Sequence, residues 1–274
     1  MGNYHGDFIW YELMSPDHRA AESFYGPLVG WSFDSDEAYR HIAASEGHIG
    51  GILQLTPEMT AGGAAPAWVG YITVDEVDKM VASIAADGGQ VHMPARDMEG
   101  VGRMAMVADP QGAVFYVMKP TPPEGVDDPE SFAFSYDRPR MGHCAWNELS
   151  TSDPGTAKRF YGKHFGWVPD GEMDMGPMGK YEFLRHAGRA PDGSPMGHGV
   201  LGAVMPLVPG GAPVPVWTYY FRVPDIDAAA ERIGAGGGTM LQEPMEIPGG
   251  DYALVASDPQ GAHFGLVGAR EGAG

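Results

Sequence analysis

Two glutamates occupy the same place in a motif that this 274-residue chain contains twice. Glu12 lies in Trp10-Tyr11-Glu12-Leu13, and Glu148 lies in Trp146-Asn147-Glu148-Leu149. A carboxylate held among indole and phenol rings loses hydration and can accept or donate a proton near neutral pH. Either glutamate could therefore act as a general acid or base. The alternative is structural: each carboxylate accepts hydrogen bonds from backbone or tyrosines, and its presence in both copies favours this interpretation.

The motif belongs to a duplication that covers most of the chain. Residues 10–31 return at 146–167, and residues 68–113 return at 217–262. The second copy is longer between these blocks, and its extra residues fit the Gly/Pro/Met-rich stretch 171–198, which includes loop-type sequence. Every candidate residue therefore has a counterpart with which it can be compared.

Each copy is expected to fold as βαβββ followed by βαβββ. Asp17 is a favourable N-cap, and the apolar spacing after it predicts a helix that Gly30 ends. Asp153 and Pro154 begin the equivalent helix in the second copy. The first copy predicts strands near 8–14, 31–34, 38–44, 49–55, 67–74, 90–94, 102–108 and 113–118, with a second helix at 76–87. We expect domains at 1–119 and 142–274, joined by a Pro-rich acidic linker at 120–141.

Composition narrows the classes of partner. The chain carries 17 basic and 36 acidic residues, and a net charge of −19 repels nucleic acid and anionic membrane surfaces. No apolar run suits a membrane span, and the N-terminus lacks a secretory pattern, so a cytoplasmic location is expected. The single cysteine, Cys144, excludes an internal disulfide and is interpreted as a small buried residue rather than a nucleophile. The expected partner is a small molecule, and the expected state is a monomer or homodimer.

The ordered motifs resemble a known superfamily. Trp-x-Glu-Leu, Phe-Tyr-Gly, Gly-Trp and Asp-Pro-Gln-Gly-Ala, present in both copies, resemble the vicinal oxygen chelate superfamily, which includes glyoxalase I, extradiol dioxygenases and bleomycin-binding proteins. The resemblance implies an α+β fold of tandem glyoxalase-like domains, in which four βαβββ modules form curled mixed sheets around cups. It is specific for the fold and much less specific for the activity.

The resemblance also implies where a divalent metal would bind. The family's ligand positions fall on Trp10, Val69 and Tyr116 in the first copy and on Trp146, Thr218 and Gly265 in the second. None of these suits a transition metal, which prefers imidazole or carboxylate here. We therefore expect no cofactor. An unusual site built from His48, His92 and His198 is the disfavoured alternative.

Strand alternation then predicts which residues face the cups. The first copy contributes Trp10, Glu12, Tyr71 and Tyr116, a mostly aromatic set. The second contributes Trp146, Glu148, Thr218, Tyr220, Arg222 and His263 and is chemically richer, because Arg222 and His263 replace Thr73 and Val114. Whether Trp68 and Trp217 contact a ligand or belong to the core stays open.

Three functions fit these residues. The first is a metal-free protein that binds an organic, partly aromatic molecule in a cup, for sequestration or sensing. The second is a glyoxalase-like lyase or isomerase in which Glu148 and His263 act as acid and base. The third is a structural or regulatory protein whose cups are filled by its own side chains. The second cup is where we expect a ligand.

Overall fold

The computed structural model describes residues 3–34, 39–122, 125, 129–135, 140–187, 199–208 and 211–270. These residues form four modules of the expected type. The first half contains module 1, with β1 (Phe8–Ser15), α1 (His18–Tyr25), η1 (Gly26–Gly30), β2 (Ser32–Phe33), β3 (Tyr39–Ala44) and β4 (Gly47–Gln54). After the short helix α2 (Pro57–Ala61) comes module 2, with β5 (Ala67–Thr73), α3 (Val77–Ala86), β6 (Gln90–Met98), β7 (Gly102–Ala108) and β8 (Val114–Pro120).

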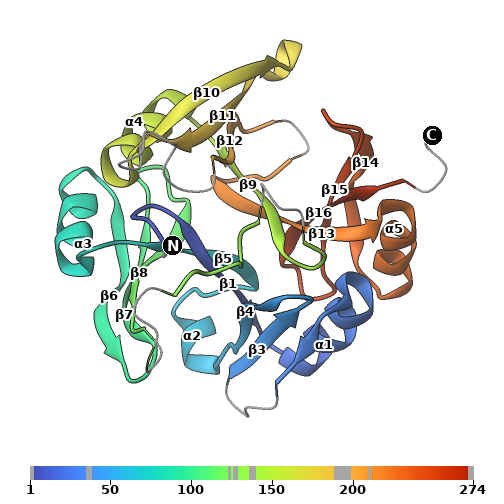
Figure 1. Ribbon diagram of the computed structural model, residues 1–274, viewed down its shortest axis with the longest axis horizontal. Helices are drawn as coiled ribbons and strands as arrows, with labels where there is room; N and C mark the ends of the chain where they lie inside the picture. Colours follow the sequence, from blue (N-terminus) through green and yellow to red (C-terminus); the bar gives the residue numbers. More distant parts are fainter. Residues whose placement is uncertain are drawn as a thin grey trace. The chain divides into compact units, whose positions relative to one another are not determined.

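The second half repeats this order. Module 3 comprises β9 (Cys144–Thr151), α4 (Pro154–Phe165), β10 (Trp167–Asp174), the 3-10 turn η2 (Gly176–Met178), β11 (Lys180–His186) and β12 (Val200–Pro206). Module 4 comprises β13 (Val216–Asp225), α5 (Ile226–Ala235), β14 (Thr239–Glu246), β15 (Tyr252–Ser257) and β16 (His263–Ala269). Figure 1 shows these elements along the chain.

The strands make two eight-stranded mixed sheets with the same topology. Their orders are β2-β3-β4-β1-β5-β8-β7-β6 and β10-β11-β12-β9-β13-β16-β15-β14. Within each module the first and last strands run parallel, as in β1 with β4 and β13 with β16, and the remaining neighbours are antiparallel. The α+β fold with tandem modules that the sequence predicts is therefore confirmed.

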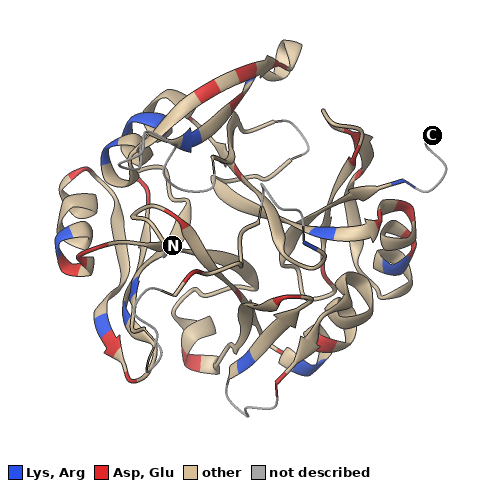
Figure 2. Ribbon diagram, viewed as in Figure 1, with Lys and Arg blue, Asp and Glu red and all other residues tan. Residues whose placement is uncertain are grey.

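The chain divides into two compact units, each drawn from both halves. Unit 1 contains Met1–Ile9, Gly70–Ser131 and Asn147–Trp217, and unit 2 contains Trp10–Val69, Phe132–Trp146 and Thr218–Gly274. In unit 1, α3 packs along β6, β7 and β8, and in unit 2, α5 packs along β14, β15 and β16 (Figure 1). No helix among the described residues is both long and apolar enough to span a membrane. Acidic residues outnumber basic ones in both units (Figure 2).

The repeated motifs build the same buried network in each unit. In unit 2, the Tyr25 hydroxyl donates to Asp258 Oδ2 at 3.2 Å and accepts from Trp68 Nε1 at 3.0 Å. Unit 1 repeats these bonds at the same distances with Tyr161, Asp109 and Trp217. Burial raises the pKa of both aspartates. Trp68 and Trp217 are each only 4% exposed, which assigns them to the core.

The two helix starts predicted at Asp17 and Asp153 are confirmed. Asp17 and Asp153 cap α1 and α4 through their side chains, and Asp109 Oδ1 accepts from the backbone of Gln111 and Ala113 in the Asp-Pro-Gln-Gly turn. A Cβ added at Gly50 would lie 1.9 Å from the Tyr11 carbonyl oxygen, so glycine there allows a close strand approach.

The stretch 171–198 is only partly described. Its first part is a regular hairpin, since Met173 lies opposite Tyr181 and Asp174 opposite Lys180 in the β10–β11 ladder. Residues 188–198, including His198, lie outside the described residues.

Candidate functional site

The inner face of each sheet is the face that carries Trp10 or Trp146. On β9 the burial alternates: Trp146, Glu148 and Ser150 are half-buried, and the residues between them are buried. Tyr220 of β13 lies on this face, because Trp146 packs against the cluster that contains Tyr220 and Val267. Arg222 lies two residues after Tyr220 on the same strand, beside Val267, and therefore faces the same way. In all four modules, the term inner face refers to the sheet face that carries these residues or their equivalents in the other copy.

Two of the six tryptophans differ from the rest. Trp31, Trp68, Trp167 and Trp217 are 2–5% exposed, and the indole of each donates a hydrogen bond inside its unit. Trp10 and Trp146, at the position of the family's first metal ligand, are half-buried on the inner face. Four indoles therefore belong to the core. Only Trp10 and Trp146 among the six tryptophans are accessible enough to contact a ligand on the inner face.

In module 1, Trp10 belongs to a group of aromatic and imidazole rings. Its Nε1 donates to the Tyr39 hydroxyl at 2.8 Å, and the His41 ring meets both rings edge-on. His48 lies next to His41 and pairs with Asp34 at 2.7 Å. The sequence analysis missed Tyr39 and His41, although their alternation in the predicted strand 38–44 could have identified them.

The two motif glutamates differ in exposure. Glu12 is 4% exposed, whereas Glu148 is half-buried and its Oε2 accepts a hydrogen bond from the Tyr181 hydroxyl at 2.8 Å. Tyr181 was also missed by the sequence analysis. A phenol that donates to a carboxylate fixes the position of that side chain.

Modules 2 and 4 carry different groups at equivalent inner positions. Tyr71 of β5 lies beside Tyr116 of β8, and their rings stack at 4.1 Å with an interplanar angle of 13°. In module 4, Tyr220 lies beside Gly265, and a Cβ at Gly265 would be 2.3 Å from the Tyr220 ring. Glycine therefore lets the Tyr220 ring lie directly over β16.

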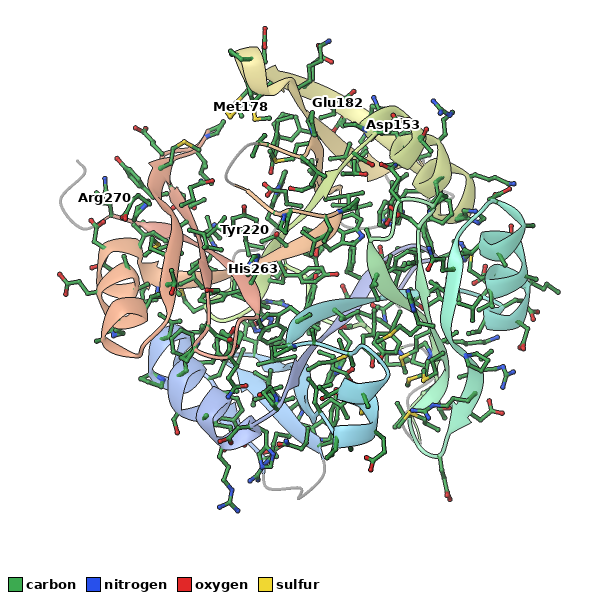
Figure 3. The ribbon with its side chains drawn as sticks, turned by 180° about the vertical axis from the view of Figure 1, so that it is seen from behind. Asp153, Met178, Glu182, Tyr220, His263 and Arg270 are labelled. Atoms are coloured by element: carbon green, nitrogen blue, oxygen red, sulfur yellow. The ribbon has the colours of Figure 1, made fainter. Side chains whose placement is uncertain are left out.

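Module 4 also carries the charged inner residues. Arg222 Nη2 donates to Asp251 Oδ2 at 2.8 Å, and its backbone pairs with the segment before β9 through Gly142 and His143. His263 is half-buried at the start of β16, near Tyr220 (Figure 3). Tyr220 is the register partner of Gly265, so Thr218 and His263, each two residues earlier on its strand, fall at matching positions on this face. Thr218, Tyr220, Arg222 and His263 therefore form one row on the inner face of unit 2.

The predicted acid/base residues Glu148 and His263 belong to different units, and Cys144 belongs to the core. Glu148 belongs to unit 1 and His263 to unit 2. Cys144 is fully buried, burial raises its thiol pKa to about 12, and its sulfur contacts the Trp146 carbonyl at 3.2 Å. This thiol is protonated at neutral pH, which agrees with a small core residue rather than a nucleophile.

The six positions of the family's metal ligands do not fit a divalent metal. They present two indoles, Val69, Thr218, the stacked Tyr116 ring and Gly265, and none of these is a good ligand for zinc, iron or manganese. Among the described residues, no group of three or more His, Cys, Asp or Glu side chains is arranged to hold a metal ion. His92 is exposed on β6 and belongs to unit 1, whereas the paired His48 and Asp34 belong to unit 2.

The repeated modules and the inner face define a glyoxalase-type protein. The chain belongs to the Glyoxalase/Bleomycin resistance protein/Dioxygenase superfamily, whose model matches residues 8–117 and 140–266. It is 33% identical to the Putative glyoxylase CFP32 of Mycobacterium tuberculosis, over 94% of this chain and 93% of that protein. It is 31% identical to the Anthracycline biosynthesis protein DnrV of Streptomyces peucetius, over 96% and 93%.

A solved structure shares the fold at low identity. The 2,2',3-trihydroxybiphenyl 1,2-dioxygenase of Sphingomonas wittichii superposes with a TM-score of 0.65 at 12% identity, covering 97% of this chain and 91% of that one. A likeness at this identity concerns the fold alone.

Proposed function

We propose that this protein binds a small organic, partly aromatic molecule on the inner face of its second half, without a metal. The observation that carries the proposal is the exposure of two tryptophans, Trp10 and Trp146, at the family's first metal-ligand position. A partly exposed indole on a sheet face offers a large, rigid apolar surface for a planar ligand.

Of the two inner faces, the one in the second half is the better candidate for binding a ligand. Tyr220 lies in a buried cluster with Ala145, Ala253 and Val267, and the half-buried side chains of Trp146, Ile247 and Val255 pack against it. Arg222 and His263 flank this apolar patch in the same unit and supply the polar contacts that fix a ligand's orientation. An apolar patch with a few polar groups is the usual composition of a small-molecule site.

Tryptophan fluorescence tests the proposal directly. A screen of aromatic metabolites by thermal shift identifies a ligand, because a molecule that binds only the folded state raises apparent stability. That ligand is then titrated against the wild type, Trp146→Phe and Trp10→Phe. We expect the fluorescence change to persist in Trp10→Phe and to disappear in Trp146→Phe. A saturable change that persists fully in Trp146→Phe would place the ligand elsewhere.

A lyase or isomerase reaction is the second candidate. It is favoured by the half-buried Glu148, which Tyr181 orients, and by the likeness to a protein named as a putative glyoxylase. Glu12, the matched residue of the first half, is the control. If this candidate is correct, Glu148→Gln removes turnover of a screened substrate and Glu12→Gln retains it. Equal turnover in both variants would exclude an acid/base role for Glu148.

A further inference from the structure

We propose that the ligand of the second half is a planar aromatic acid whose acidic oxygen binds Arg222 while its ring packs on the apolar patch around Trp146. This inference rests on the proposed function and names the chemical class of its ligand. It is carried by the contacts of the Arg222 guanidinium, by the comparison with module 2 and by the spacing of residues along β13.

The guanidinium of Arg222 has unused hydrogen-bonding capacity. Its side chain is 15% exposed and donates from Nη2 to Asp251, but its Nε is buried and has no hydrogen-bond partner among the described residues. A buried donor of a charged group without an acceptor is unfavourable. Nη1 also has no hydrogen-bond partner among the described residues, and unlike Nε it is not buried. The Nη1–Nη2 edge is therefore the part of the guanidinium that a ligand can reach, and its two adjacent N–H groups can donate to one carboxylate.

The charged pair is not required by the sheet itself. The equivalents of Arg222 and Asp251 in the first copy are Thr73 and Gly102, so both members of the pair are absent together. Thr73 nevertheless has the same register position, beside Met118, that Arg222 has beside Val267. The first half thus builds the same strand pairing without an ion pair. We therefore assign Arg222 and Asp251 to ligand recognition in the second half rather than to holding the sheet together.

The spacing along β13 defines the shape of the ligand. Inner residues two apart are separated by about 6.6 Å along a strand, so Arg222 and Thr218 are about 13 Å apart with Tyr220 between them. Three linearly fused rings that carry a carboxylate approach this distance, and one or two rings cover part of it. Its acid would lie at Arg222, its rings over Trp146, Ile247 and Val255, and any second polar group near His263.

Asp251 has a defined part in this arrangement. It is 31% exposed and holds one edge of the guanidinium, so the group is fixed before the ligand arrives. A fixed guanidinium loses less conformational entropy on binding than a free one. The acidic chain as a whole repels anions, and selection for an acid must therefore come from local contacts at Arg222.

Matched acids and amides test the inference. Benzoate, 2-naphthoate and anthracene-2-carboxylate are titrated by calorimetry against the full-length protein, each beside its primary amide. We expect at least one acid to bind about tenfold or more tightly than its amide, as a charge-assisted pair predicts. Arg222→Thr, which copies the first half, should reduce the ratio to about one. Arg103→Thr, which breaks an exposed ion pair in module 2, should leave the ratio unchanged.

The outcomes separate the two proposals. Binding of acids and amides with equal affinity, unchanged in Arg222→Thr, would overturn the acid preference and leave small-molecule binding in place. If none of the six compounds binds, both the aromatic site and the acid preference are overturned. Circular dichroism confirms that Arg222→Thr is folded. Arg222→Lys, which keeps the charge but loses the fork, should give an intermediate ratio.

Discussion

The inner-face residues of β5 and β8 in module 2 and of β13 and β16 in module 4 lie on equivalent strands, but their side chains differ. In module 2, Tyr116 stacks on Tyr71 and fills the row with two rings. In module 4, Gly265 replaces the second ring and lets Tyr220 lie over the strand. Both rows share a register, so the difference lies in side chains and not in the backbone. Duplication has kept the framework and changed the chemistry of one face.

The buried networks show the opposite behaviour. Tyr25 with Asp258 in unit 2 and Tyr161 with Asp109 in unit 1 have the same partners and the same hydrogen-bond distances. Residues that hold the fold are thus matched in the two copies. The inner face keeps some matched residues, such as Trp10 and Trp146, but differs at Tyr116 and Gly265 and at Thr73 and Arg222. The comparison predicts equal effects for core substitutions and unequal effects for inner-face substitutions.

The largest expected effect on stability comes from adding a side chain where two neighbouring strands lie too close together to accommodate one. A Cβ would lie 1.9 Å from a backbone oxygen at Gly50 and 1.8 Å at Gly202, and the backbone cannot move aside without breaking the sheet. Gly50→Ala and Gly202→Ala should each lower the free energy of unfolding by about 3 kcal/mol. Urea denaturation measures the loss. A loss at only one of the two positions would mean that the halves do not share this constraint.

The buried tyrosines should produce the next largest effect. Tyr25→Phe leaves Trp68 Nε1 and Asp258 Oδ2 without their shared partner, and Tyr161→Phe does the same to Trp217 and Asp109. Each change should cost about 1–3 kcal/mol, the usual cost of unsatisfied buried groups. Denaturation midpoints of the two variants should agree closely. A negligible cost in one of them would contradict the matched framework.

The sequence predicts the framework well because its signals are local. Caps such as Asp17 and Asp153, alternation in strands and paired motifs identified the four modules. The contacts of Tyr39 and His41 with Trp10, and of Tyr181 with Glu148, join strands that are distant in sequence, and alternation within one strand does not specify such contacts. The pairing of Arg222 with Asp251 likewise depends on two strands meeting, which composition and spacing do not specify.

Gly265→Ala should affect ligand binding more than stability. The new methyl group would displace the Tyr220 ring, whose nearest atom lies 2.3 Å from the added carbon. Since a side chain can rotate, the stability cost should be about 1 kcal/mol. Binding of 2-naphthoate should weaken about tenfold, because the apolar patch is packed around Tyr220. Calorimetry and thermal unfolding of the same samples separate the two effects. A stability loss with unchanged affinity would remove Tyr220 from the site.

The smallest stability effect is expected for the charged pair. Arg222→Thr breaks the bond to Asp251, but that carboxylate is 31% exposed and recovers water, while the unpartnered Nε is removed. A partly exposed ion pair contributes about 1 kcal/mol or less. Urea denaturation should therefore give almost the wild-type midpoint. A loss above about 3 kcal/mol would instead make Arg222 part of the framework, because buried ion pairs that hold a fold are costly to break. The difference between modules 2 and 4 would then reflect packing rather than ligand recognition.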